Sequence, residues 1–334
     1  MKIRTSIDNL ENYKIFLKVE EAVCEFLKQR GYLKVDLPVL SPALVPESYL
    51  EVFKTQFNFL NKKKNLYLIP TPELFQKRLL AYGSINNYYL GKCFRNSEPS
   101  SQLHSFEFTM LELYKMEATY WDIADEVLKM LKFVAKKLNN KEEIIYQGQK
   151  ISFSRWEKIS VGQAFKTFAA VGENELFDKE IFMRKAKDKG YKTKGFSYED
   201  IFSQIYTQEI EPNLGRRGYP TLIFDYPKEF AALAKLNEDG LTAQRFEFYI
   251  EGIELGDCYS ELTDWKEQRD RFSQESNKRK ILKKINHPVD KGFIEALKYG
   301  LPKCAGIAIG FERLAMIFAD IISINQLKLI NIDL

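Results

Sequence analysis

The sequence predicts an α+β fold, and two kinds of pattern carry that prediction. Residues 106–114 and 244–250 alternate in polarity as strands do, because successive strand side chains point to opposite faces. Residues 8–30, 118–139 and 264–284 instead place apolar side chains at helical spacing. Strands and helices are therefore both expected in quantity, with a sheet that the helices cover.

Turn and cap residues set further boundaries in the first third of the chain. Residues 56–60 and 66–69 predict a hairpin whose polar tip, 61–65, exposes its lysines. Thr71 is expected to cap a helix that has Pro72 at its first position, which places Glu73 in the first turn.

The segment from 140 to about 215 has a weaker pattern, in which short helices alternate with loops. No internal repeat or low-complexity linker separates it from the rest. We therefore expect a single domain, 1–334, with a helical insertion at about 140–215.

The charge of the chain is mild for its size. Its 334 residues hold 50 Lys and Arg against 46 Asp and Glu, a net charge of +4. That balance does not indicate a dedicated nucleic-acid binder. Basic runs at 183–195 and 277–284 could face an acidic partner, but solvated helix faces are the more ordinary explanation.

Cysteine placement and hydropathy indicate the compartment. Apolar stretches fall short of the roughly 18 residues that a membrane span needs, so no membrane partner is expected. The cysteines have no close neighbours in sequence, which argues against a disulfide framework and a zinc site: Cys24, Cys93, Cys258 and Cys304. A cytoplasmic protein is expected.

The stretch 94–114, FRNSEPSSQLHSFEFTMLELY, is the strongest candidate for a functional site. It reads as a strand end carrying Arg95, a polar loop and a returning strand. Glu112 and Tyr114 share one face of that strand beside aromatic side chains. Such groups are costly to bury without partners, so a site is favoured over a polar pair in a core.

Three acidic residues, Glu254, Asp257 and Glu261, follow the strand at 244–250. Clustered carboxylates repel one another, so the sequence predicts a positive ligand near them, with a solvated acidic edge as the alternative. Further on, three small residues alternate on one strand face and leave room for a flat group: Gly306, Ala308 and Gly310.

Three motifs carry a family resemblance. FRN followed by H and EFTMLELY at 94–114 resembles motif 2 of the class II aminoacyl-tRNA synthetases of the lysine subgroup. GIAIGFERLAMIF at 306–318 resembles motif 3, and GYLKVDLPVLS at 31–41, with Pro38, resembles motif 1. The resemblance implies a class II catalytic core with a mixed, mainly antiparallel sheet flanked by helices, and a homodimer formed through motif 1.

The resemblance also implies the reaction and its site. ATP would activate a lysine-like amino acid with Mg²⁺ present, and Arg95 and Arg313 would clamp the reacting groups. Glu247 and Glu254 would hold Mg²⁺, Phe108 would stack on adenine, and His104 would approach the triphosphate. Further nucleotide contacts are implied for Asn96, Ser97, Glu98, Ser105, Glu254, Leu255 and Gly310. Substrate contacts are implied for Thr71, Pro72, Glu73, Glu112, Tyr114, Asp257, Glu261 and Ala308.

Within the subgroup, Ala308 and the segments EPNLG and GIEL...SELTD resemble the branch that ligates (R)-β-lysine to elongation factor P. The roughly 30 residues ahead of motif 1 are too few for an N-terminal oligonucleotide-binding (OB) barrel, so no anticodon-binding domain is expected, although tRNA is a possible partner. Asp257 departs from the asparagine of the family. As a hypothesis, it receives a displaced amine or marks a different substrate.

Two other functions remain open. The chain could be a free-standing enzyme that makes an aminoacyl adenylate for tRNA or a small molecule. It could also be an inactive regulatory paralogue, but the charged residues that it retains argue against that, because a dead site has no need for them: Arg95, Glu247, Glu254, Glu261 and Arg313.

Overall fold

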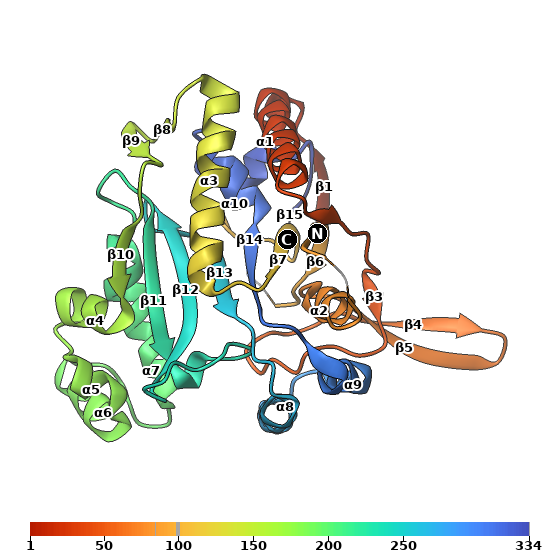
Figure 1. Ribbon diagram of the computed structural model, residues 1–334, viewed down its shortest axis with the longest axis vertical. Coiled ribbons are helices and arrows are strands. Elements are labelled where there is room, and N and C mark those ends of the chain that lie inside the picture. The colour runs from red at the N-terminus through yellow and green to blue at the C-terminus, as the bar shows by residue number, and fades with distance from the viewer. Residues whose placement is uncertain (84, 98–100, 334) are drawn as a thin grey trace.

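The computed structural model describes residues 1–83, 85–97 and 101–333. An eight-stranded sheet runs through it in the order β10-β11-β12-β13-β14-β7-β6-β2 (Figure 1). The two outermost pairs, β10 with β11 and β2 with β6, are parallel, and the others are antiparallel. The strands are β2 (Leu33–Lys34), β6 (Asn87–Phe94), β7 (Glu107–Met116), β10 (Glu157–Ser160), β11 (Thr221–Pro227), β12 (Thr242–Ile250), β13 (Ile253–Ser260) and β14 (Cys304–Gly310). The predicted mixed, mainly antiparallel sheet is confirmed.

Three helices cover one face of this sheet: α1 (Leu10–Gln29), α3 (Tyr120–Asn139) and α10 (Phe311–Phe318). Figure 1 shows α3 in front of the sheet, with α10 and α1 beside it. Apolar residues of β7, β12 and β14, among them Leu111, Phe246 and Ile307, join these helices in one buried core. Helix α3 begins with a capping box between Thr119 and Asp122, which satisfies backbone donors at its start.

The opposite sheet face meets α2 (Glu73–Ala81), α8 (Trp265–Ile281) and α9 (Lys291–Gly300). Leu74 of α2, Phe272 of α8 and Phe293 of α9 pack in one cluster with Tyr114 of β7. The sheet therefore separates an apolar core from a second face that carries polar side chains.

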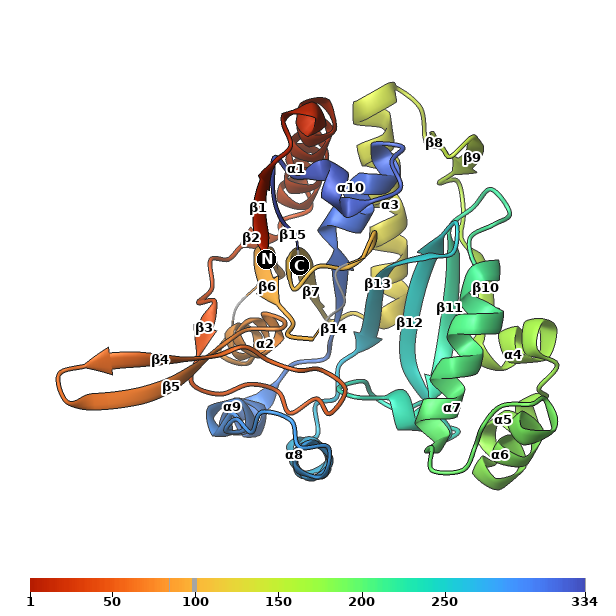
Figure 2. The ribbon, with the colours of Figure 1, turned by 180° about the vertical axis from the view of Figure 1, so that it is seen from behind.

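The expected helical insertion begins with strands. Residues 143–160 form β8 (Glu143–Tyr146), β9 (Gln149–Ser152) and β10, and β10 extends the main sheet. Four helices follow, α4 (Val161–Ala169), α5 (Glu173–Phe177), α6 (Lys179–Asp188) and α7 (Tyr198–Ile205). Figure 2 shows them beside β10 and β11, and their apolar residues pack against Ile223, Tyr226 and Tyr249 of the sheet. These strands are only four residues long with mixed polarity, which explains why no period was visible.

A long hairpin, β4 (Lys54–Phe59) and β5 (Lys62–Leu68), projects away from the body of the molecule (Figure 1). It pairs with β3 (Leu40–Ser41). The turn lies at Leu60 and Asn61, so the lysines expected at the tip belong to strand β5 instead. The terminal strands β1 (Lys2–Thr5) and β15 (Ile330–Asp333) pair with each other.

The segment ahead of β2 consists of β1, a 3₁₀ turn (Ile7–Asn9) and α1. Residues 1–32 are all described, and they form no five-stranded barrel, as the sequence predicts. Within the described ranges, no helix combines the length and the apolar character that crossing a bilayer requires.

Candidate active site

Sheet register brings four of the predicted site residues into one line across neighbouring strands. Glu112 on β7 lies opposite Ala308 on β14, which lies opposite Asp257 on β13, and Asp257 lies opposite Glu247 on β12. Directly paired residues share a sheet face and have adjacent side chains. Segments far apart in sequence thus meet on the polar face of the sheet.

A second line runs parallel to the first, two residues along each strand. Tyr114 lies opposite Gly306, Gly306 opposite Tyr259, and Tyr259 opposite Arg245. The Tyr114 ring lies against Gly306, where an added Cβ would come within 2.3 Å of the ring. The flat group expected against the small residues is, at Gly306, a side chain of the protein itself.

Glu112 is buried and doubly hydrogen-bonded. Its two carboxylate oxygens accept hydrogen bonds of 2.7 Å from the Thr71 hydroxyl and from the Tyr114 phenol. Burial, and after it the charge of Glu73, raises the pKa of Glu112 above its usual range. Thr71 and Pro72 directly precede α2, so the hydrogen bond from Thr71 places the start of α2 beside Glu112.

Lys77, which the sequence analysis did not single out, lies at the centre of this pocket. Its ammonium forms ion pairs with Glu73 and Glu261 and lies 5.8 and 5.3 Å from the ring centres of Tyr114 and Tyr259. Although burial opposes it, the pair of carboxylates raises the pKa of Lys77. The spacing of Glu73 and Lys77, four residues apart on one helix, was the available signal.

Glu73 and Glu261 are thus engaged by a cation of the protein. Glu73 Oε1 also accepts a 2.9 Å hydrogen bond from the Tyr259 hydroxyl. Glu261 Oε1 is buried and accepts no hydrogen bond from the described residues. Glu261 Oε1 is therefore an oxygen of the pocket to which a ligand can donate a hydrogen bond.

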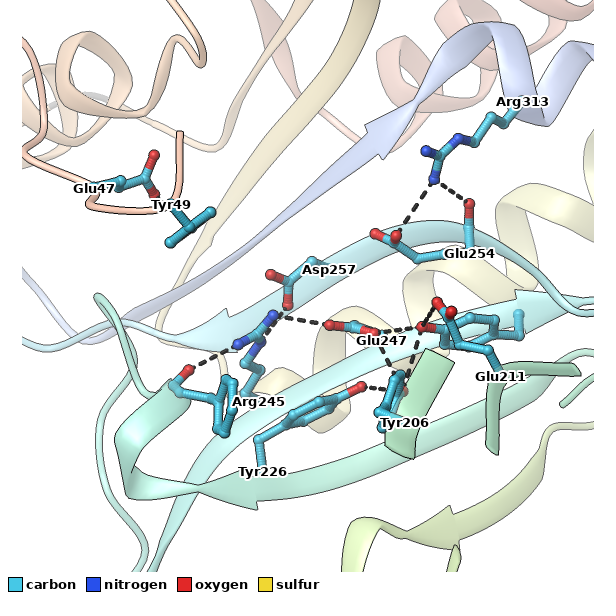
Figure 3. A network of polar contacts seen from close by, with 12 residues as sticks. Glu47, Tyr49, Tyr206, Glu211, Tyr226, Arg245, Glu247, Glu254, Asp257 and Arg313 are labelled. Carbon is cyan, nitrogen blue, oxygen red and sulfur yellow. Dashed lines mark hydrogen bonds and ion pairs between the residues drawn. The ribbon is translucent and has the colours of Figure 1, made fainter. Parts of the chain in front are cut away.

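Asp257 also has a cation of the protein as its partner. Arg245 donates from Nε to Asp257 Oδ1 and from Nη2 to Glu247 Oε1, both at 2.8 Å (Figure 3). Its guanidinium lies 4.6 Å from the ring centre of Tyr226. Burial raises the pKa of Asp257 although Arg245 opposes that shift. Arg245 therefore compensates the acid that replaces the asparagine of the family.

Tyrosines surround the second oxygen of Glu247. Tyr249 donates to Glu247 Oε2 at 2.6 Å and Tyr206 at 3.3 Å, and Tyr206 contacts Tyr226 through a 2.6 Å hydroxyl pair. Figure 3 shows this network continuing to Glu211. Of the side chains in it, the sequence analysis had assigned a role only to Glu247.

Glu254 meets Arg313 at the start of α10. Arg313 Nη1 donates to the backbone oxygen of Glu254 at 2.9 Å and to Oε2 at 3.3 Å. Arg313 Nη2 lies 2.8 Å from His104 Nε2, and Nε donates to the Leu103 oxygen. Arg313 thereby joins motif 3 to the motif 2 loop. The cluster of Glu254, Asp257 and Glu261 is thus matched by three internal cations.

Arg95 lies at the other strand end of the hairpin. Its guanidinium carbon is 5.2 Å from the centre of the Phe108 ring, and its Nε is buried with no hydrogen-bond partner among the described residues. A buried donor without a partner is costly, so it suits an anionic ligand. The buried Nε of Arg95 is therefore a donor that a nucleotide phosphate can accept from, beside the Phe108 ring.

Glu247, Glu254 and Glu211 are the acids whose charges suit a magnesium ion. Burial, and also the charges of neighbouring glutamates including Glu254, raises the pKa of Glu247 and of Glu211. A divalent cation relieves such repulsion, so these acids fit Mg²⁺. Among the described residues no three His, Cys, Asp or Glu form a ready metal site, and Mg²⁺ commonly uses one or two carboxylates together with substrate phosphates.

Other predicted nucleotide contacts are placed less favourably. Leu255 is buried in the apolar core, so only its backbone can face a ligand. Ser105 accepts a hydrogen bond from Lys328, and the Asn96 side-chain amide donates to the Val52 oxygen. Ser97 has a left-handed φ of 65°.

Glu98 and Gly310 are the remaining predicted nucleotide contacts. The prediction for Glu98 falls outside the described residues. Gly310 has only aliphatic atoms of Arg313 near the place of an added Cβ, at 3.7 to 4.0 Å. A hollow of about 500 Å³ between α8 and α9 is a different place, since the described residues that line it include no predicted site residue.

The loop between β3 and β4 (residues 42–53) follows motif 1 and is called the motif 1 loop. It contributes two further residues that sequence reasoning missed. Glu47 and Tyr49 project toward the strands that carry Asp257 and Arg245 (Figure 3). The loop has no hydrophobic period, so the sequence offered no signal for them.

Comparison with known proteins identifies the family. The model for "tRNA synthetases class II (D, K and N)" matches residues 2–330. A lysine–tRNA ligase of Carboxydothermus hydrogenoformans is 35% identical over 323 residues, 96% of this chain but 64% of that protein. Elongation factor P (R)-β-lysine ligases of Buchnera aphidicola and Hamiltonella defensa are both 34% identical and cover 92% of this chain, and the matches span 92% and 91% of those proteins.

This chain spans 64% of the length of the lysine–tRNA ligase, and 92% and 91% of the two elongation factor P ligases. The family match covers almost the entire chain. The chain therefore belongs to the class II tRNA synthetases of the D, K and N group.

Proposed function

We propose that this protein activates a lysine-like amino acid with ATP and transfers it to a lysine side chain of elongation factor P. In the first step an oxygen of the amino-acid carboxylate attacks the α-phosphorus, and the bond to pyrophosphate breaks. In the second step the acceptor amine attacks the carbonyl carbon of the adenylate, AMP leaves, and the amine loses a proton. Neither step needs an oxidant or reductant.

The continuous polar face of the sheet is the observation that supports this function. It carries the acids Glu112 and Glu261, and two arginines lie along the same strands, Arg95 beside Phe108 of β7 and Arg313 beside Glu254 of β13. A diamino acid needs carboxylates for its side-chain ammonium, and the charge that develops on phosphate needs guanidinium groups. A neutral isostere would leave the buried acids without a partner, so the pocket favours a cationic side chain.

The residues of this chain position the reactants. Arg95 and Arg313 orient the phosphate and the attacking carboxylate, which lowers the entropy cost of an in-line displacement. Glu247 and Glu254 would hold Mg²⁺, which supplies charge neutralisation on the phosphates when it is bound. Phe108 offers a ring against which adenine can stack.

The acceptor is proposed from chain coverage. The elongation factor P ligases match at 92% of this chain and at 91% or more of their own length, whereas the lysine–tRNA ligase is matched over 64% of its length. Because two ligases named for elongation factor P match over nearly their whole length, a protein acceptor is proposed first. tRNA is the second candidate because of the 35% identity to the lysine–tRNA ligase.

One experiment tests substrate and acceptor together. The protein is incubated with ATP, Mg²⁺ and either lysine or (R)-β-lysine, with elongation factor P in one arm and lysine tRNA in the other. We expect intact-mass spectrometry to show one added aminoacyl group on elongation factor P. Acylation of tRNA alone would favour the second candidate. Absence of pyrophosphate exchange with every amino acid would favour an inactive paralogue.

The role of Asp257 is tested separately. Since Arg245 already neutralises it, we propose that Asp257→Asn frees Arg245 and weakens discrimination among diamino acids. ATP–pyrophosphate exchange with α-lysine, β-lysine and ornithine measures the ranking. An unchanged ranking in Asp257→Asn would reject a selective role for this acid.

We also propose that the protein is a cytoplasmic homodimer. Cys24, Cys93, Cys258 and Cys304 are all free thiols, as a reducing compartment permits. Leu33, Val39 and Leu40 of the motif 1 region are exposed large apolar residues that a second copy could cover.

A further inference from the structure

The loop between β3 and β4 is fixed from outside the site by one buried arginine. Arg279 of α8 donates to the backbone oxygens of Glu47 at 2.7 Å, Leu50 at 2.6 Å and Ile285 at 2.7 Å. It also donates to Glu51 Oε1 at 3.2 Å. A planar guanidinium with several acceptors holds a backbone in one shape. Side chains on the site side of this loop are therefore positioned in advance.

Glu47 is one of those side chains, and Tyr49 is its partner. The Tyr49 hydroxyl donates to Glu47 Oε1 at 3.0 Å. The other oxygen, Oε2, is buried and accepts no hydrogen bond from the part of the chain that is described. Burial, followed by the charge of Glu73, raises the pKa of Glu47 to about 7, while Arg95 lowers it. The charges of Glu73 and Arg95 thus both act on Glu47, whose side chain projects toward the strand that carries Asp257 (Figure 3).

Glu73, for which the family resemblance implies a substrate contact, already has partners within the protein. Glu73 Oε1 is held by the Lys77 ammonium and by the Tyr259 hydroxyl. Glu112 accepts two hydrogen bonds, from Thr71 and Tyr114. A buried carboxylate oxygen without a donor is an expensive feature unless a ligand supplies one.

Glu261 Oε2 pairs with Lys77, so within the part of the chain that the structure describes two buried carboxylate oxygens remain without a donor, Glu261 Oε1 and Glu47 Oε2. The charge of Glu73 acts on both glutamates and raises the pKa of each. Glu261 belongs to the end that holds Lys77 and Tyr114, and Glu47 to the end that holds Arg95, where the reacting carboxylate is proposed to bind. A ligand with two ammonium groups, one far from its carboxylate and one near it, matches this pair.

We infer that Glu47 is a specificity-determining residue that accepts a hydrogen bond from the substrate amine nearest the reacting carboxylate, with Tyr49 holding its carboxylate in position. The role of Glu47 rests on the proposed function, because it requires an amino-acid substrate. It defines the substrate class as a diamino acid whose second amine lies at the α or β carbon.

The test compares two ligands in direct binding, measured by titration calorimetry on the full chain. Lysine carries the second amine, and 6-aminohexanoate is the same molecule without it. We expect Glu47→Gln to weaken lysine binding roughly tenfold or more and to change 6-aminohexanoate binding little, because only lysine can use the lost charge. Tyr49→Phe should give a smaller change of the same kind. Glu21→Gln, at an exposed glutamate on α1, is the matched control and should change neither.

The outcomes separate the two proposals. Equal weakening of both ligands by Glu47→Gln would mean that Glu47 acts through the loop structure, and the inference would be overturned. A wild-type protein that binds lysine but catalyses no pyrophosphate exchange would refute the proposed function while leaving the role of Glu47 intact. A wild-type protein that binds neither ligand would overturn both.

Discussion

At the scale of single residues, each acid of the cluster Glu254, Asp257 and Glu261 meets a cation that the chain itself supplies. Arg313 contacts Glu254, Arg245 contacts Asp257 and Lys77 contacts Glu261. Charges removed from water are costly unless they are paired, and removing one member of a buried pair leaves the other uncompensated. The internal cations therefore set how much positive charge a ligand has to bring.

Lys77 gives the sharpest test of this arrangement. Lys77→Met keeps most of the side-chain volume but leaves Glu73 and Glu261 without their ammonium partner. We expect a loss of about 3–5 kcal/mol in the free energy of unfolding, measured by urea denaturation near neutral pH. Adding Glu261→Gln to this variant should recover part of the loss.

The matched control is Lys14→Met, which removes a Lys–Glu pair on the exposed side of α1. The side chains of Lys14 and Glu11 are 53% and 79% exposed. Exposed pairs contribute about 1 kcal/mol or less, so this variant should lose little. Similar small losses for Lys14→Met and Lys77→Met would contradict the assigned role of the buried ammonium.

Gly306→Ala tests the seat of the Tyr114 ring. The added Cβ would come within 2.3 Å of Tyr114 Cε1, so the ring has to move away from Glu112. We expect a loss of about 1–3 kcal/mol in unfolding free energy and weaker lysine binding, measured by urea denaturation and calorimetry. Gly310→Ala, where the nearest atom lies at 3.7 Å, should affect stability much less. Equal effects at both glycines would refute the steric explanation.

At the scale of elements, the motif 1 loop depends on the end of α8. Arg279→Lys keeps the charge but loses the fork that holds the oxygens of Glu47, Leu50 and Ile285. We expect faster amide exchange across residues 44–53 and weaker lysine binding, with the helices otherwise intact. Arg269→Lys is the control, because exposed Arg269 contacts its helix neighbours Asp270 and Trp265. Unchanged exchange in Arg279→Lys would show that the loop is held by other contacts.

The elements differ in how much of them could be predicted. Alternation over 106–114 gave strand β7 and the correct face for Glu112 and Tyr114, because a strand period is local. The line from Glu112 to Glu247 depends on pairing between distant strands, which no local pattern encodes. The short strands of 143–160 were missed for want of enough residues to show a period.

Site residues were predictable only where a motif or spacing marked them. Arg95 and Arg313 stand in recognisable motifs, and Lys77 could have been found from its position four residues after Glu73. Glu47 and Tyr49 lie on an aperiodic loop whose shape is set by Arg279, more than 220 residues away in the chain. Their approach to the site is a tertiary property.

At the scale of the whole molecule, the buried acids predict how stability changes with pH. The pKa of Glu47 is raised to about 7 from 4.5, and burial also raises the pKa values of Glu112 and Glu261. The folded protein therefore binds more protons than the unfolded chain above about pH 4.5, so stability falls as pH rises through that window. Although burial opposes them, hydrogen bonds lower the pKa values of Glu126 and Glu275, whose stabilisation is lost at lower pH.

Urea denaturation at about pH 4, 5.5 and 7.5 should consequently show greatest stability near the middle value. Glu47→Gln removes one group with a raised pKa, so its decline between the middle and upper values should be shallower than in the wild type. A wild-type stability that rises steadily toward neutral pH would contradict the predicted dominance of the raised groups.

The projecting hairpin predicts the state of association. Phe57, Phe59 and Leu60 are 53%, 62% and 87% exposed, and such a protruding apolar strip is stabilised when a second copy covers it. We expect Phe57→Asp combined with Phe59→Asp to convert a dimer into a monomer in sedimentation velocity, with an unchanged circular dichroism spectrum. Ile281→Asp, an equally exposed apolar residue on α8 away from the hairpin, should leave the dimer intact. If both variants sediment like the wild type, the hairpin does not contribute to the interface.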